Sequence, residues 1–162
     1  MRVAALLLLL AATTAAQADE YHLKSAEART GTLIKRDAAI GSLPFDKPYA
    51  DLWSEDKARF RAIYESMAED DEPPFPLRGF KPLYRKIEVL NRKLDARGML
   101  DLAVVVGPDG LAQTVTVYKS PDDELTRSVA YLLMQEKFKP ALCHGQPCSQ
   151  EFPFRVNFTM RR

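Results

Sequence analysis

Cys143 and Cys148 are the residues whose type and spacing point most directly to chemistry, because they are the only cysteines in the chain. Gly145 and Pro147 lie between them and favour a turn. In an oxidising compartment such a pair is expected to form a disulfide, which would stabilise so short a loop by roughly 2 kcal/mol. Redox activity and metal binding are the alternatives, although redox motifs usually follow the Cys-X-X-Cys spacing and His144 adds a single further ligand. The pattern therefore favours a structural disulfide over a redox or metal site.

Other residues are not arranged for catalysis. His22 and His144 are the only histidines, and His144 adjoins a cysteine that should be oxidised. A serine or cysteine nucleophile would therefore lack a suitable base. Nucleophile-elbow, phosphate-loop and metal-helix patterns do not occur in the sequence. We expect no enzymatic activity, no cofactor and no bound metal.

The strongest binding feature is an alternating pattern at the end of the chain. From 152 to 160, phenylalanine, valine and methionine occupy every second position, which predicts a strand with one buried face. Arg155, Asn157 and Thr159 fall on the opposite face, where they could contact the side chains of a bound segment. An unpaired outer edge of this strand would accept a further strand from a partner. Coverage of that edge by residues 43–53 or by a second copy of the protein is the open alternative, so a homodimer is also considered.

A hairpin and two helices must hold this strand in place. The hairpin joins strands at 99–106 and 111–118 through the turn Gly107-Pro108-Asp109-Gly110. Asp101, inside the first of these strands, is expected to face solvent or to meet a basic side chain. An amphipathic helix precedes the hairpin at about 83–94, because apolar residues recur there on one helical face.

A second helix, at about 120–136, follows the hairpin. Ser120 is its predicted N-cap and Pro121 suits its first position. A short loop at 143–148 then leads to the last strand. The order helix, strand, strand, helix, strand predicts a two-layer α+β fold with a three-stranded antiparallel sheet, strand order 2-1-3, and helices on one face.

The N-terminal half of the chain differs in character, since it is polar and rich in proline. One helix is predicted at about 54–69, with Ser54 as N-cap and with apolar residues spaced three and four apart. The prolines at 73–76 should end it and form a stiff extended connector. The predicted organisation is a signal peptide at 1–18, an extension at 19–80 and a folded domain at 81–162.

The first residues have the order of an export signal. Arg2 precedes an apolar run from Val3 to Ala16, and the small residue Ala18 precedes the acidic Asp19. This run is shorter than the roughly 20 residues that a spanning helix requires. We therefore expect cleavage between Ala18 and Asp19, no stable membrane span afterwards and a periplasmic location.

Charge composition narrows the class of partner. Removal of Arg2 with the signal brings the 23 basic and 22 acidic side chains into balance. A neutral chain lacks the clustered positive charge that nucleic acids and anionic membranes attract. We expect a protein partner and no nucleic acid.

Several motifs follow one another in an order that resembles one family. They are Pro82-Leu83-Tyr84, Gly98 before a strand, the turn Gly107-Pro108-Asp109-Gly110, Ser120-Pro121-Asp122, Phe138-Lys139-Pro140-Ala141, Gly145-Gln146-Pro147 and the phenylalanine-rich last strand. Over about 82–160 the sequence resembles the C-terminal domain of the TonB energy-transducer family. The resemblance implies the same two-layer fold and a role in transport. Members of that family reach through the periplasm, pull on outer-membrane receptors and bind a short receptor segment as an added strand.

The departures from that family shape the functional hypothesis. Its transducers keep an N-terminal membrane helix and a long proline-rich span, whereas this chain has a predicted cleavable signal and a short proline stretch. The leading hypothesis is a soluble periplasmic module that binds an envelope protein, such as an outer-membrane receptor segment, by strand addition. A membrane-anchored energy transducer is the first alternative. A thiol-active envelope enzyme using Cys143 is the second.

Overall fold

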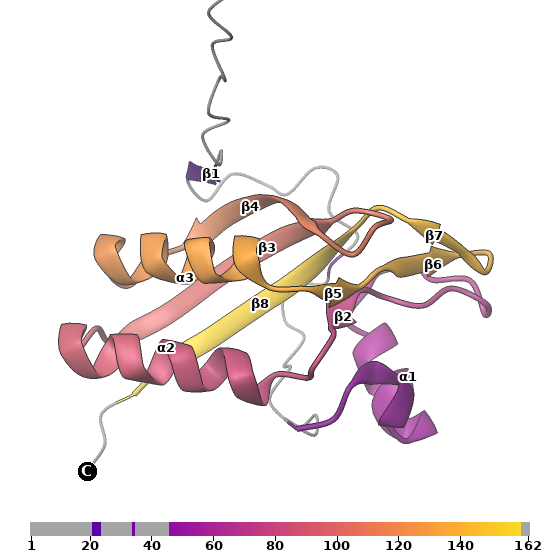
Figure 1. Ribbon diagram of the computed structural model, residues 1–162, viewed down its shortest axis with the longest axis horizontal. Coiled ribbons are helices and arrows are strands. Elements are labelled where there is room, and N and C mark those ends of the chain that lie inside the picture. Colours follow the sequence, from indigo (N-terminus) through magenta and orange to yellow (C-terminus); the bar gives the residue numbers. More distant parts are fainter. Residues whose placement is uncertain (1–20, 24–33, 35–45, 160–162) are drawn as a thin grey trace, which may run out of the picture.

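Residues 21–23, 34 and 46–159 are described in the computed structural model of the chain (Figure 1). The predicted export signal and its cleavage site between Ala18 and Asp19 lie outside the described residues, as does Met160 in the last predicted strand.

An antiparallel sheet forms the centre of the fold. β3 (Gly98–Val106) lies between β4 (Ala112–Lys119) and β8 (Gln150–Phe158), and both neighbours run antiparallel to it. β1 (Tyr21–Leu23) joins the outer side of β4 in parallel, so the sheet has four strands where three were predicted. A strand of three residues is too short to show a period of two in the sequence, and only its pairing with β4 reveals it.

Two long helices lie on one face of the sheet (Figure 1). α2 (Lys81–Leu94) and α3 (Asp123–Gln135) pack against each other, and α3 also packs on β4. The start of α3 corrects the predicted N-cap, because Asp122 rather than Ser120 occupies that position. The Asp122 carboxylate accepts a hydrogen bond from the Leu125 N–H at 2.8 Å, which satisfies a donor of the first turn.

Apolar side chains from the helices and from the facing side of the sheet form one core. Its fully buried members include residues of α2, α3, β3, β4 and β8, namely Leu83, Ile87, Leu125, Leu133, Leu100, Leu102, Val104, Val115, Phe152 and Phe154. Aromatic rings link the layers, since Tyr84 of α2 lies 5.7 Å from Phe154 of β8 between ring centroids. Burial of these side chains supplies the main stabilisation of the fold.

The helix predicted at 54–69 is shorter than expected. α1 (Ser54–Arg61) ends eight residues early, and Trp53 rather than Ser54 precedes its first turn as N-cap. The chain leaves it in a tight turn, because the Arg61 guanidinium donates hydrogen bonds to the carbonyl oxygens of Ala68, Glu69 and Asp71. These bonds fold residues 68–71 back toward the helix, which a continuous helix could not allow.

The proline stretch at 73–76 is extended and buried. β2 (Phe75–Pro76) pairs in antiparallel fashion with β5 (Phe138–Lys139). The ring of Phe75 lies 4.9 Å from that of Phe80 and 5.2 Å from that of Phe60. The stretch therefore attaches α1 to the same core as the sheet.

A small hairpin replaces the loop predicted at 143–148. β6 (Ala141–Cys143) pairs with β7 (Gln146–Cys148) in antiparallel fashion. Leu142 also exchanges two backbone hydrogen bonds with Glu72, at 2.8 and 2.9 Å. The hairpin is thus joined to the N-terminal segment as well as to the strand that follows it.

Candidate binding groove beside the last strand

β8 is an edge strand among the described residues, since β3 is its one neighbour in the sheet there. A groove of about 470 Å³ runs beside its C-terminal half. The groove is bounded by α2, by the turn after α2 and by the last residues of β8. Its lining residues are Tyr84, Ile87, Glu88, Asn91, Arg92, Asp95, Ala96, Arg97, Val156, Asn157, Phe158 and Thr159.

The side of β8 that points away from β3 can be assigned residue by residue. The N–H and C=O of one residue in an antiparallel strand point to the same side, and this side alternates along the strand. The Tyr64 hydroxyl, which comes from outside the sheet, donates to the Glu151 carbonyl oxygen at 2.9 Å. Glu151 and the alternate positions Pro153, Arg155 and Asn157 therefore direct their backbone groups outward. Pro153 fits this assignment, because a proline without an N–H is tolerated on the outer side of an edge strand.

The N-terminal half of this edge is covered by the segment that follows α1. Tyr64 is buried, with 2% of its surface exposed. Burial raises the pKa of Tyr64 well above 10.0, and the nearby Glu151 charge raises it further. The phenol therefore stays protonated and acts as a hydrogen-bond donor to the edge. With Pro153 next along the strand, the N-terminal half is poorly suited to pair with another chain.

The groove beside the C-terminal half has an apolar wall and a polar rim. Ile87 is buried, and burial also raises the pKa of Tyr84 to about 12. Val156 and Phe158 are partly buried against the core on the same face of the sheet. These residues provide a surface on which an apolar side chain of a bound segment would be removed from water.

The rim carries charges of both signs. Asp95 and Arg97 form an ion pair at 2.8 Å, and Glu88 and Arg92 add a further charge of each sign from α2. Asn91 is held in place because its side chain bonds the N–H and the C=O of Ala96, at 3.0 and 3.2 Å. The turn that closes the groove is thereby fixed by the end of α2.

The predicted site residues lie in two different environments. Asn157 and Thr159 are exposed and line the groove. Arg155 is 19% exposed and forms an ion pair with Asp101, its cross-strand neighbour, at 3.2 Å. The basic side chain expected near Asp101 is therefore Arg155, whose guanidinium is directed along the sheet rather than into the groove.

Sequence reasoning missed the helical side of the groove. Tyr84, Ile87 and Asn91 belong to α2, whose amphipathic pattern was interpreted as core packing alone. Their spacing of three and four residues places them along one helical stripe. The helical spacing of these three residues was therefore a signal in the sequence that could have identified this side of the groove.

The cysteine pair lies away from the groove. Cys143 and Cys148 are joined by a disulfide, with their Cα atoms 5.8 Å apart. The hairpin that contains them is at the opposite end of the sheet from the C-terminal end of α2 (Figure 1). It comes directly before β8 in the chain, so it helps to define where the edge strand begins.

Comparisons with known proteins support one family. Residues 90–160 match the family model for the Gram-negative bacterial TonB protein C-terminal. No match was found among curated proteins or among solved structures.

The matched segment contains β3, β4, α3 and β8, which are the elements that build the sheet and its open edge. Within the described ranges, no helix is long and apolar enough to cross a membrane. The matched family is a non-enzymatic interaction and energy-transduction domain of Gram-negative envelope proteins, whose members generally contact outer-membrane proteins. Residues 90–160 of this chain are therefore similar to the C-terminal domain of Gram-negative bacterial TonB proteins.

Proposed function

We propose that this protein is a soluble periplasmic module that binds an extended segment of an envelope protein as an added strand along the C-terminal half of β8. The single observation that carries the proposal is the groove of about 470 Å³ between that strand and α2. An edge strand offers a row of backbone donors and acceptors, and a groove beside it provides space for the incoming chain.

The geometry limits where pairing would occur. Asn157 directs its N–H and C=O outward, away from β3, and Thr159 continues the edge beyond it. The Tyr64 contact and Pro153 obstruct the N-terminal half of the strand. A bound segment would therefore pair over a few residues, starting near the C-terminal end of β8.

The chemistry of the groove indicates what kind of segment it accepts. Alternate side chains of an added strand point to opposite faces. Those on the helix side would meet Tyr84 and Ile87, so apolar residues are favoured at these positions. Charged residues of either sign can meet the rim at Arg92 or Asp95. A segment that alternates apolar and polar residues, such as an exposed stretch of an outer-membrane receptor, suits this surface.

Periplasmic location and the loss of the leader are part of the proposal. Loss of the leader is inferred from the sequence pattern at residues 1–18. The periplasmic location is inferred from that pattern and from the family match, which is to Gram-negative envelope proteins. The alternative is a membrane-anchored energy transducer, which the same match favours. The two differ in the mass of the protein recovered from cells: loss of residues 1–18 supports the soluble module, whereas retention supports the transducer.

A crosslinking experiment tests the binding mode. A photoreactive amino acid at Thr159 should capture an envelope protein through an extended segment, which mass spectrometry of the adduct would identify. The same group at Tyr131, an exposed side chain on α3, is the matched control. Asn157→Pro removes an outward N–H without breaking the β3 ladder, so it should abolish the Thr159 adduct in a folded protein. Adducts of equal yield at Tyr131, or adducts that persist in Asn157→Pro, would refute strand addition at this edge.

A further inference from the structure

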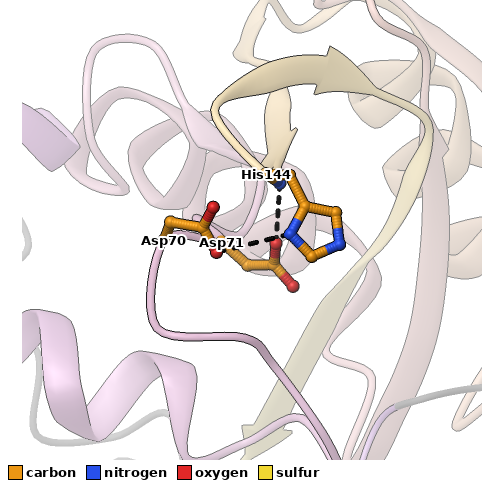
Figure 2. A group of neighbouring side chains, drawn as sticks. All are labelled: Asp70, Asp71 and His144. Atoms are coloured by element: carbon orange, nitrogen blue, oxygen red, sulfur yellow. Dashed lines mark hydrogen bonds and ion pairs between the residues drawn. The ribbon is translucent and has the colours of Figure 1, made fainter.

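A cluster of three potential metal ligands lies outside the groove. The side chains of Asp70, Asp71 and His144 each contribute an atom to a set within 4.8 Å of one another (Figure 2). Asp70 and Asp71 belong to the segment before β2, and His144 lies in the turn of the disulfide hairpin. Sequence reasoning considered His144 as a ligand beside the two cysteines and as a catalytic base, and did not connect it with Asp71, which is 73 residues away.

The scaffold around the cluster is fixed without any ligand. Glu72, next to Asp71, exchanges two backbone hydrogen bonds with Leu142, two residues before His144. The Cys143–Cys148 disulfide closes the hairpin that carries His144. On the other side, Arg61 binds the carbonyl oxygens of residues 68, 69 and 71. Both ligand-bearing segments are therefore held together by contacts that do not involve the three side chains, and such pre-organisation reduces the cost of binding.

The distances agree with a small ion of tetrahedral preference. His144 Nδ1 lies 3.5 Å from Asp70 Oδ1. Two ligands at the usual zinc bond lengths are about 3.4 Å apart in a tetrahedron. Figure 2 shows the imidazole and the carboxylates gathered on one side of the hairpin turn. Little movement of Asp70 or His144 is needed to place both on one ion.

Asp71 is positioned as a third ligand. Its two carboxylate oxygens accept hydrogen bonds from the N–H groups of His144 and Ala68, both at 2.9 Å. A carboxylate has about four lone-pair positions, so each oxygen keeps one for a metal. The hydrogen bonds orient the group without exhausting its acceptors.

We propose that Asp70, Asp71 and His144 bind a divalent transition-metal ion of the zinc type, with solvent in the remaining position. The nitrogen ligand and the small donor number favour zinc over calcium, which takes six to eight oxygen ligands. The side chains of Asp70 and His144 are 60% and 77% exposed, so the ion can enter directly from solvent. The disulfide hairpin is already joined to the N-terminal segment by the Glu72–Leu142 backbone hydrogen bonds and by the bond from the His144 N–H to Asp71. A bound ion would add a metal-mediated link.

Zinc titration into the full chain, with its disulfide intact and no chelator present, tests the proposal. Calorimetry should show one ion bound per chain. Loss of a group that only hydrogen-bonds a metal ligand already weakens metal binding by about 10- to 100-fold. Replacement of a direct ligand in Asp70→Asn or His144→Gln should therefore weaken it at least roughly tenfold. Because both side chains are exposed, neither variant should disturb the fold, which circular dichroism would verify.

Two matched controls make the result decisive. Glu69→Gln removes an exposed acid beside the cluster, and His22→Gln removes the other histidine; both should leave zinc affinity unchanged. In the wild type, zinc should also shift the imidazole resonances of His144 in NMR spectra. Absence of zinc binding to the wild type, equal losses in Glu69→Gln, or unaltered binding in His144→Gln would each overturn the proposal.

Discussion

Removal of the Tyr64 hydroxyl, by Tyr64→Phe, should destabilise the protein because it deletes a buried contact between the N-terminal segment and the sheet. The hydroxyl donates to the Glu151 carbonyl oxygen at 2.9 Å, and the side chain is 2% exposed. An intramolecular hydrogen bond contributes about 1 kcal/mol, and loss of one buried partner costs about 1 to 3 kcal/mol. Since water can reach part of the edge once the hydroxyl is gone, we expect a loss of about 1 to 2 kcal/mol in the free energy of unfolding.

Urea denaturation measures this loss directly. The midpoint should fall while the dependence of the free energy on urea stays constant, because the surface exposed on unfolding is nearly unchanged. Tyr131→Phe is the matched control, since it deletes the same atom from a side chain that is 61% exposed. Its free energy should change by less than about 0.5 kcal/mol. Equal midpoints for the two variants would refute the assignment of Tyr64 as an anchor of the β8 edge.

Alkaline titration provides an independent check on the same residue. The folded pKa of Tyr64 is raised well above 10.0, mainly by burial. The protonated phenol therefore contributes stability that is fully present below pH 10.0 and is lost as the pH rises toward the folded pKa. The wild type should lose stability in this range faster than Tyr64→Phe, so that the two curves converge. If the free energies of unfolding of the two proteins stay a constant distance apart as the pH rises, the burial of an un-ionised phenol at Tyr64 is contradicted.

Three further variants test the turn and the disulfide. Gly110→Ala should cost about 1 to 3 kcal/mol, because Gly110 has a φ of 77° and an added Cβ would overlap the Phe138 carbonyl oxygen. Gly145→Ala is the matched control, because Gly145 has a φ of 74° and no atom lies within 4 Å of the added Cβ; it should show only the backbone cost of about 1 kcal/mol. Equal losses of stability for Gly110→Ala and Gly145→Ala in thermal denaturation would contradict the clash. Replacement of Cys143 and Cys148 by serine should lower the free energy of unfolding by roughly 2 kcal/mol and remove its sensitivity to reductant, whereas a variant as stable as the wild type would show that the disulfide is not structural.

Local patterns in the sequence determined the main strands of the sheet. The alternation after Gln150 predicted β8, and the turn from Gly107 to Gly110 predicted the hairpin of β3 and β4. The motif order predicted the TonB C-terminal domain, which the family match bears out over residues 90–160. These features could be predicted because burial on one face of a helix or strand imposes a period that is visible within one segment.

Contacts between distant segments were decided only by the tertiary structure. The end of α1 depends on the carbonyl groups that Arg61 binds, and β1 depends on its pairing with β4. Phe75 appears in the sequence as part of a connector, yet it is fully buried because the rings of Phe60 and Phe80 pack against it.

The two candidate sites are also products of the fold. The groove exists because α2 lies beside the open half of β8, and the cluster of Asp70, Asp71 and His144 exists because Glu72 pairs with Leu142. The predicted edge residues Asn157 and Thr159 line the groove, whereas Arg155 pairs with Asp101. A periodic pattern records which face of an element is buried, but it carries no information on which distant segment buries it. The sequence by itself therefore determined the elements whose burial has a clear period, and the packing of the elements determined where a partner or an ion can bind.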